Sequence, residues 1–129
     1  WQWCAWSGVS ADIASLQYPW YSSRDLVKLW TTNYEYFTGS PNGGWVGSWY
    51  SSALNSPLYY QLGGLYSVQS KAGWIAEGGL SASNDVGIVW ANNGPYLVAI
   101  LSSFPSNTVR LSDLVWALEA AHNEMVATY

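Results

Sequence analysis

The spacing of hydrophobic residues predicts a long amphipathic helix in the first third of the chain. Between 22 and 39, large apolar side chains recur three or four positions apart, which places them on one helical face: Leu26, Trp30, Tyr34 and Phe37. Ser22 precedes Asp25 by three residues, the spacing of a capping box, and Gly39 is suited to end the helix. We therefore expect one long helix that buries its apolar face.

Shorter helices are expected after it. Residues 45–54 have the pattern of a short helix whose buried side carries three large apolar residues: Trp45, Trp49 and Leu54. Ser56 followed by Pro57 has the form of an N-cap and a first helical residue, and two glycines after Leu62 end that helix.

The pattern then changes from a helical period to a strand period. In 85–91 apolar and other residues alternate, and Asn92-Asn93-Gly94 follows as a turn. Residues 96–102 continue as an apolar run that suits a strand buried on both faces, and 66–74 can also be extended. We expect three strands, with a hairpin that turns at 92–94.

The chain ends in a predicted helix from about 112 to 126, capped near Ser112 and packed on the sheet through one stripe of residues: Leu114, Leu118, Ala121 and Met125. The order of helices, three strands and one helix indicates an α+β fold with an antiparallel sheet and flanking helices. Residues 1–129 fit a single domain, and 1–20, which lack a sustained period, form a loop-rich lead-in.

The amino-acid composition favours some classes of function and argues against others. Only 9% of residues are charged and 17% are aromatic, so some aromatic rings are expected to contact a partner, a ligand or another copy. The four Lys and Arg residues are scattered and the net charge is −4, which argues against nucleic-acid binding. No apolar run approaches the roughly 20 residues of a membrane-spanning helix.

Metal and cofactor chemistry has no support in the sequence. Cys4 and His122, the only cysteine and histidine, lie at opposite ends of the chain and do not form a ligand cluster. We therefore expect no metal and no cofactor, and a free buried thiol at Cys4.

Several motifs, in order, resemble the C-terminal part of the serine β-lactamase and penicillin-binding transpeptidase family, particularly class A-like serine hydrolases. "SKAGW" (70–74) is similar to the family's Lys-Thr/Ser-Gly strand, and "SNDVGIVW" (83–90) to the strand that follows it. "GPYLVAILSS" (94–103) is similar to the next strand and "LSDLVWALEAAHNEMV" (111–126) to the C-terminal helix. The resemblance covers roughly residues 20 to 127 and implies a partial domain from an exported bacterial protein, extracellular or at the cell surface.

The resemblance implies a substrate-binding role for three residues. Lys71 corresponds to the lysine that supplies positive charge for the substrate carboxylate, and Gly73 to the glycine that lets the substrate approach the backbone. Ala72 departs from the family pattern, because it has no hydroxyl to donate a hydrogen bond. This departure makes ordinary β-lactamase activity a weaker expectation.

The family's nucleophile motif is missing from these 129 residues. Neither Ser-x-x-Lys nor Ser-Asp-Asn occurs, although Ser67 lies four residues before Lys71 and Ser70 is adjacent to it. In the family, both motifs precede everything matched here. We therefore assign no catalytic residue and expect this C-terminal portion of a serine hydrolase to be inactive alone.

The sequence also allows other roles for these residues and for the aromatic side chains. Lys71 can be a solvated lysine, and His122 a partly buried helix residue rather than a base. Glu77 and Asp85 can meet across a loop as a glycosidase pair, which needs carboxylates about 5–10 Å apart. Flat rings also suit sugar binding, and five are concentrated in one part of the chain: Trp45, Trp49, Tyr50, Tyr59 and Tyr60. The alternative function is therefore a non-enzymatic, aromatic-rich assembly protein or a protein that binds cell-wall glycan.

The strand at 96–102 is the expected partner surface. In the resembling family the corresponding strand pairs with one from the N-terminal segment. We therefore expect 96–102 to pair with the N-terminal half of the same domain or with another copy of the chain, because a long apolar edge recruits strands. Cell-wall glycan or peptide is a further candidate partner.

Overall fold

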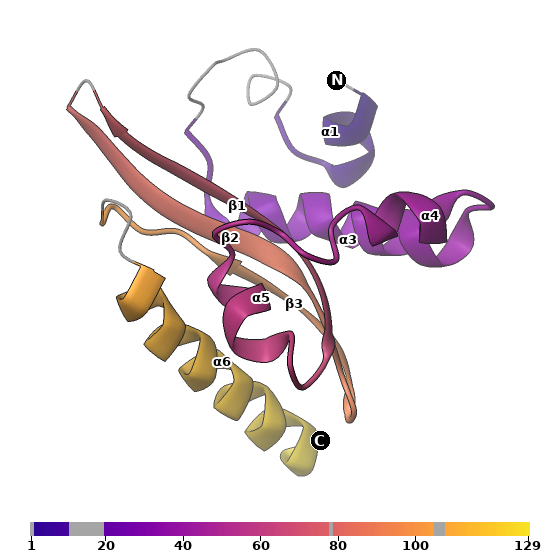
Figure 1. Ribbon diagram of the computed structural model, residues 1–129. Helices are drawn as coiled ribbons and strands as arrows, with labels where there is room; N and C mark the ends of the chain where they lie inside the picture. The colour runs from indigo at the N-terminus through magenta and orange to yellow at the C-terminus, as the bar shows by residue number, and fades with distance from the viewer. Residues whose placement is uncertain (1, 11–19, 78, 105–107) are drawn as a thin grey trace.

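A three-stranded antiparallel sheet in the order β1-β2-β3 carries helices on both faces (Figure 1). The computed structural model describes residues 2–10, 20–77, 79–104 and 108–129. Its elements, in chain order, are α1 (Gln2–Ser7), α3 (Ser23–Gly39), α4 (Gly43–Ser48), α5 (Pro57–Leu62), β1 (Ser67–Glu77), β2 (Leu80–Ala91), β3 (Gly94–Ile100) and α6 (Thr108–Thr128). The predicted α+β class and its antiparallel sheet are confirmed.

One face of the sheet packs against α3. Trp30 and Phe37 of α3 are buried with Val86 and Ile88 of β2, as the predicted periods of both segments require. The capping box at the start of α3 is also present: the Asp25 N–H donates to Ser22 Oγ over 3.2 Å, and the Ser22 N–H donates to Asp25 Oδ2 over 2.9 Å. Local signals and packing therefore agree for this helix.

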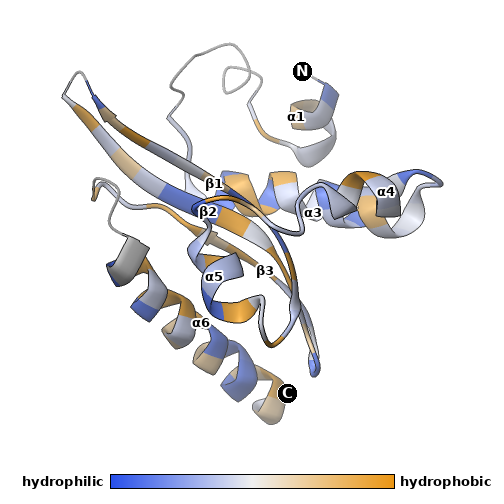
Figure 2. Ribbon diagram, in the orientation of Figure 1, coloured by the Kyte–Doolittle hydropathy of each residue, from blue (hydrophilic) through white to orange (hydrophobic). Residues whose placement is uncertain are grey.

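The opposite face packs against α5 and α6. Leu58 and Leu62 of α5, Val89 of β2 and Val115 of α6 are at most 1% exposed and form the centre of this second core. Along β2 a hydrophilic stretch interrupts the apolar positions (Figure 2). The sequence of β2 includes Ser83-Asn84-Asp85, and Asp85 is fully buried. A buried carboxylate between two strands needs hydrogen-bond donors, and these define the candidate site below.

The predicted hairpin is confirmed, although β2 is longer than the predicted 85–91 and β3 spans 94–100 rather than 96–102. Trp90 pairs with Pro95 and Ala91 with Gly94, so the chain reverses at the predicted Asn92–Gly94 turn. A second hairpin joins β1 and β2, whose register extends to Glu77 opposite Leu80. This second turn was not expected from the sequence. Regular β3 ends at Ile100, but the Ser83 N–H still donates to the Ser102 carbonyl over 2.9 Å.

The terminal helices differ from the expectation. α1 lies within the predicted loop-rich lead-in, whose residues 11–19 fall outside the described ranges. α6 begins at Thr108 rather than near Ser112. The predicted buried stripe of α6 is wrong for Leu114 and Met125, which are 41% and 63% exposed, and for Ala121, which is also exposed.

The buried face of α6 is instead offset and includes a carboxylate. Leu111, Val115 and Glu119 are each at most 5% exposed. Glu119 is tolerated because it accepts hydrogen bonds from the hydroxyls of Tyr66 and Tyr96, the first over 2.9 Å, and from Asn123 Nδ2 over 3.2 Å. A sequence pattern that counts only apolar positions cannot find such a face.

The aromatic side of α4 is exposed, which also corrects an expectation. Trp45 and Trp49 are 66% and 62% exposed, and Leu54, in the turn beyond, is 71% exposed. α4 is short and packs through its glycines: a Cβ on Gly43 would lie 1.9 Å from the Tyr36 carbonyl oxygen, and one on Gly47 2.7 Å from Gln69 Nε2. Because the small residues face the core, the tryptophans face outward.

Candidate functional site at the edge of the sheet

Lys71, Ala72 and Gly73 lie in the middle of β1, which is an edge strand of the sheet. They pair with Val86, Asp85 and Asn84 of β2. Directly opposite residues of antiparallel strands share a face, so Lys71 and Gly73 lie on the α3 side and Ala72 on the α5–α6 side. The three predicted substrate-binding residues therefore form one continuous stretch of the edge strand.

The side chains at this edge differ in exposure. Lys71 is exposed, and its Nζ donates to the Ala72 carbonyl oxygen. Ala72 is 3% exposed and lies opposite the buried Asp85. A Cβ built on Gly73 meets no atom within 4 Å, so no neighbouring group in the described structure requires a glycine there. The Lys71 side chain and the space beside Gly73 are therefore both accessible at β1.

The outer edge of β1 presents backbone hydrogen-bonding groups. The Ser70 N–H donates over 2.9 Å to the Tyr50 carbonyl, away from β2. Because N–H directions alternate along a strand, the N–H groups of Ala72 and Trp74 point to the same outer edge. Such outward N–H groups can donate to a carbonyl or carboxylate oxygen laid against the strand.

Behind this edge, Asp85 fixes the start of α5 to the sheet. Its Oδ2 accepts from Ser56 Oγ over 2.7 Å and from the Leu58 N–H over 3.0 Å, and its Oδ1 accepts from the Val86 N–H over 3.0 Å. Ser56 Oγ also lies 2.7 Å from Ser70 Oγ and accepts from the Tyr59 N–H over 3.1 Å. This buried network links α5, β1 and β2 directly beneath the Lys71 segment.

The environment of Asp85 has opposing effects on its ionisation. Burial raises the pKa of the Asp85 carboxyl to about 6, against the lowering effects of the Leu58 N–H, the Ser56 hydroxyl, the Val86 N–H and the positive charge of Lys71. The three donors suit the ionised form, whereas desolvation disfavours it. Asp85 therefore has a structural role, and its carboxyl group changes ionisation near pH 6.

The serines near Lys71 are not arranged as nucleophiles. Ser70 is 1% exposed and its hydroxyl is engaged with Ser56. Ser67 is exposed and pairs with Trp90, four residues from Lys71 along an extended strand, which is about 13 Å at the usual rise. One tripeptide, Ser40-Pro41-Asn42, has the looser form Ser-x-Asn, but it makes the turn between α3 and α4, where the Ser40 carbonyl accepts from the Gly43 N–H.

The alternative acid–base groups do not come together. Glu77 pairs with Leu80 at the hairpin end of β1, whereas Asp85 pairs with Ala72. Five residues of extended strand separate the two rungs, roughly 16 Å, which is beyond the range of a glycosidase pair. The predicted meeting of Glu77 and Asp85 is therefore wrong. His122 stacks on Tyr96 with ring centroids 4.2 Å apart and lies 3.1 Å from Asn93 Oδ1, far along the chain from the edge.

The aromatic residues proposed as a sugar surface are divided among different environments. Tyr50 packs against Trp30 and Phe37 in the core. Trp45 and Trp49 form an exposed edge-to-face pair on α4 with centroids 4.7 Å apart. The Tyr60 hydroxyl accepts from the Asn55 N–H over 2.8 Å beside α5. The two exposed tryptophans are the part of the set that remains available as a surface.

Within the described ranges, no group of three or more His, Cys, Asp or Glu side chains could hold a metal ion. A search of the same residues finds no helix with the length and apolar character to cross a membrane. Cys4 is a free thiol and 6% exposed.

Comparison with known proteins identifies the family of the chain. No curated protein and no solved structure shows significant similarity to the chain. A family model described as the β-lactamase enzyme family matches residues 9–120, most of the sequence, including β1 with Lys71 and the whole sheet. The chain therefore belongs to the β-lactamase enzyme family.

Proposed function

We propose that this chain is the C-terminal portion of a β-lactamase-like serine hydrolase and carries part of the substrate-binding edge without the nucleophile. The observation that carries the proposal is the Lys71–Gly73 segment: an exposed ammonium group, a glycine with open space around it, and outward N–H groups on an edge strand. These groups stabilise negative charge and accept an extended ligand, but they do not attack a carbonyl carbon.

In this proposal Lys71 binds the substrate carboxylate. Lys71 supplies the positive charge of β1, whose other charged residue, Glu77, lies six residues away at the hairpin end, and the Ala72 and Trp74 N–H groups donate to substrate oxygens. Ala72 offers no hydroxyl, which leaves the carboxylate with fewer donors than in the Lys-Thr/Ser-Gly pattern. The nucleophile is supplied by another segment, in keeping with a hydrolase that is inactive as this chain alone.

The open edge of β3 is the proposed docking place of that segment, or of a second copy. The Ser102 carbonyl bonds to β2, so by alternation the N–H groups of Leu97 and Ala99 point outward. Among the described residues no strand pairs with this edge. Export to the cell surface or the exterior follows the resemblance and is part of the same proposal.

The test combines activity with ligand binding. A chromogenic cephalosporin and a fluorescent penicillin should be neither hydrolysed nor trapped, because no activated serine is present. The carboxylate of the same cephalosporin should nevertheless perturb the amide signals of 71–74 in an NMR titration. Lys71→Met should remove that perturbation, and Lys28→Met, which changes an exposed lysine on α3, should not.

Hydrolysis of either β-lactam, or an acyl adduct on any serine, would refute the proposal that this chain is inactive alone. Binding that is equal in the Lys71→Met and Lys28→Met chains would refute the role of Lys71 at this edge. A glycan-binding or assembly function is the second candidate, and the exposed Trp45–Trp49 pair is the observation that favours it. It predicts that Trp45→Ala reduces glycan binding or self-association and leaves the cephalosporin titration unchanged.

A further inference from the structure

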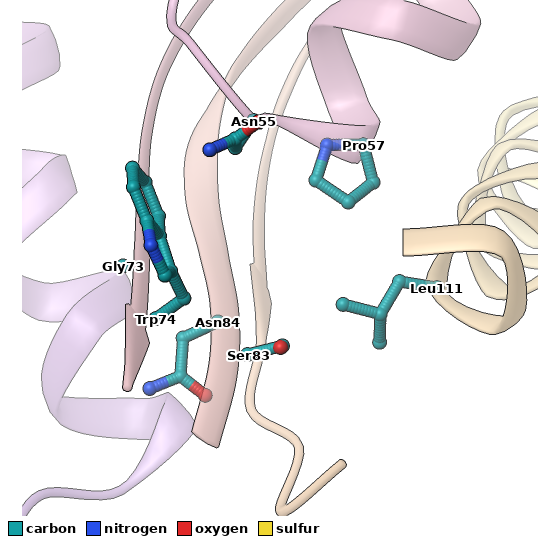
Figure 3. Close-up of a pocket in the computed structure, with 7 residues that line it drawn as sticks. All are labelled: Asn55, Pro57, Gly73, Trp74, Ser83, Asn84 and Leu111. Atoms are coloured by element: carbon teal, nitrogen blue, oxygen red, sulfur yellow. The ribbon is translucent and has the colours of Figure 1, made fainter. Parts of the chain in front are cut away.

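A small cavity lies on the α5–α6 side of the sheet, on the opposite face from Lys71. Its volume is about 200 Å³. Figure 3 shows its walls: Gly73, Trp74, Ser83 and Asn84 from the β1–β2 ladder, Asn55 and Pro57 from the start of α5, and Leu111 from α6. Trp74 and Ser83 are direct partners in the register, so they share this face.

Ser83 has an unusual hydrogen-bonding state. Its side chain is 5% exposed, and its Oγ has no hydrogen-bond partner among the described residues. Figure 3 shows this oxygen turned toward Leu111, into the cavity. A buried hydroxyl without a partner is destabilising, and native proteins rarely leave one. Neighbouring serines are satisfied: Ser81 Oγ donates to the Ser103 carbonyl over 2.7 Å, and Ser56 and Ser70 bond to each other.

The remaining walls combine neutral polar and apolar surfaces. No charged side chain lines the cavity. Asn55 is held through its backbone N–H by the Tyr60 hydroxyl, and Figure 3 shows its amide directed toward Trp74. Pro57 and Leu111 are buried apolar residues, and Trp74, 51% exposed, forms a flat wall at the opening.

We propose that this cavity is a binding subsite for a single uncharged sugar ring. Ser83 Oγ can both donate and accept, as a sugar hydroxyl requires, and the Trp74 ring can stack on the apolar face of a pyranose. The volume is smaller than the roughly 300 Å³ at which pockets for larger ligands begin, so one ring fits better than an oligosaccharide. The lining excludes ionised ligands, because a carboxylate or ammonium group here would be buried without a partner.

The subsite adjoins the edge used in the hydrolase proposal, because Gly73 and Trp74 also line the cavity, but Lys71 does not line it. Lys71→Met should therefore leave sugar binding unchanged, and Ser83→Ala should leave the cephalosporin titration unchanged. These two variants distinguish a failure of one proposal from a failure of the other.

The experiment is an NMR titration of the full 129-residue chain with methyl β-glucopyranoside, which has no charge and no acyl group. We expect shift changes at the Ser83 and Trp74 backbone amides and at the Trp74 indole N–H. Ser83→Ala should weaken binding roughly two- to tenfold without lowering the unfolding midpoint, because the lost hydroxyl makes no hydrogen bond to a described residue. Trp74→Ala should weaken binding at least as much.

Trp6→Ala is the matched control, since Trp6 is an exposed tryptophan on α1 that belongs to neither proposed site, and it should leave the affinity unchanged. No shift change around Ser83 at sugar concentrations up to about 50 mM would overturn the proposal. So would equal affinity in the Ser83→Ala chain, or a weakening by Trp6→Ala alone. If N-acetylalanine amide bound more tightly than the sugar, the ligand class would be a peptide amide, and the proposed sugar ring would be wrong.

Discussion

The two edge strands of the sheet, β1 and β3, differ in charge, in capping by other segments and in the residues whose N–H groups point outward. At β1, the Tyr50 carbonyl already occupies the Ser70 N–H, Lys71 adds a charge, and the strand continues into a long hairpin. At β3, the residues whose N–H groups point outward are the apolar Leu97 and Ala99, and no charged residue lies within the strand. Charge and capping discourage strand addition, whereas a plain apolar edge invites it.

This difference supports two different proposed roles within one sheet. The β1 edge has discrete polar features that suit recognition of a small anionic ligand. The β3 edge has repeated backbone groups that suit another strand. An edge can therefore be assigned a role from its side-chain and backbone groups before any partner or substrate is known.

Proline substitutions in β3 test the assignment of that edge most strongly. Val98→Pro removes an N–H that bonds to β2 and should destabilise the fold by about 3 kcal/mol or more. Ala99→Pro removes an N–H that points outward, so it should leave the ladder intact and block strand addition. Light scattering at low micromolar concentration should show association of the unmodified chain and its loss in Ala99→Pro, with the circular dichroism spectrum retained.

A dilute, folded monomer of the unmodified chain would contradict the docking role of β3. Equal association of the Ala99→Pro and unmodified chains would place the contact elsewhere, and the exposed α6 residues Leu114 and Met125 would then be examined.

The buried carboxylate behind the β1 edge gives the next largest effect. Because burial raises the pKa of Asp85 from 3.8 to about 6, the folded state holds this proton more tightly than the unfolded state. The resulting stabilisation is complete below about pH 4 and is lost as the pH rises through 6. The difference corresponds to about 3 kcal/mol at most.

Urea unfolding at several pH values between 4 and 7 measures this term. Asp85→Asn should flatten the pH dependence relative to the unmodified chain, since the amide does not titrate. If the two chains respond to pH identically, Asp85 does not titrate in this range, and the three donors that favour its ionised form outweigh the effect of burial.

Much of this fold follows from local signals in the sequence. The capping box at Ser22, the Asn92–Gly94 turn and the alternation in β2 each predicted the element that the structure contains. These features depend on nearest neighbours along the chain, so no tertiary information is needed to find them. The order of motifs around Lys71 also indicated the family correctly.

The sequence-based predictions that were wrong share a physical cause. Trp45 and Trp49 have a helical period, but the helix buries its glycines because only a residue without a Cβ allows α4 to approach α3. Glu119 and Asp85 are buried polar groups whose donors come from distant segments, Tyr66 and Tyr96 for one and Ser56 for the other. Apolar periodicity contains no information about such partners. Likewise, the sequence does not reveal that the buried Ser83 hydroxyl has no hydrogen-bond partner among the described residues.

Glycines on the two strands provide a smaller effect that again contrasts an open position with a filled one. A Cβ on Gly87 of β2 would lie 2.4 Å from the Gln69 carbonyl oxygen, so Gly87→Ala should destabilise the chain by about 1–3 kcal/mol. Gly73→Ala, where a Cβ meets nothing within 4 Å, should leave the unfolding midpoint nearly unchanged. Thermal unfolding of the two variants at equal protein concentration measures the contrast, and equal destabilisation would mean that the β1 edge is covered.

The smallest expected change in stability is at Lys71, and it separates a binding role from a structural one. The side chain is exposed and its described hydrogen bond is to the neighbouring Ala72 carbonyl, so Lys71→Met should alter the free energy of unfolding by less than about 0.5 kcal/mol. The same variant should lose the cephalosporin perturbation at 71–74, as described above. Lys71→Arg is the informative companion, because it keeps the charge while changing the shape of the donor group. Retained binding in Lys71→Arg, with loss in Lys71→Met, would assign the interaction to charge at this edge. A marked loss of stability in both variants would instead show that Lys71 supports the strand, and the β1 edge would then have no feature that favours an anionic ligand over another strand.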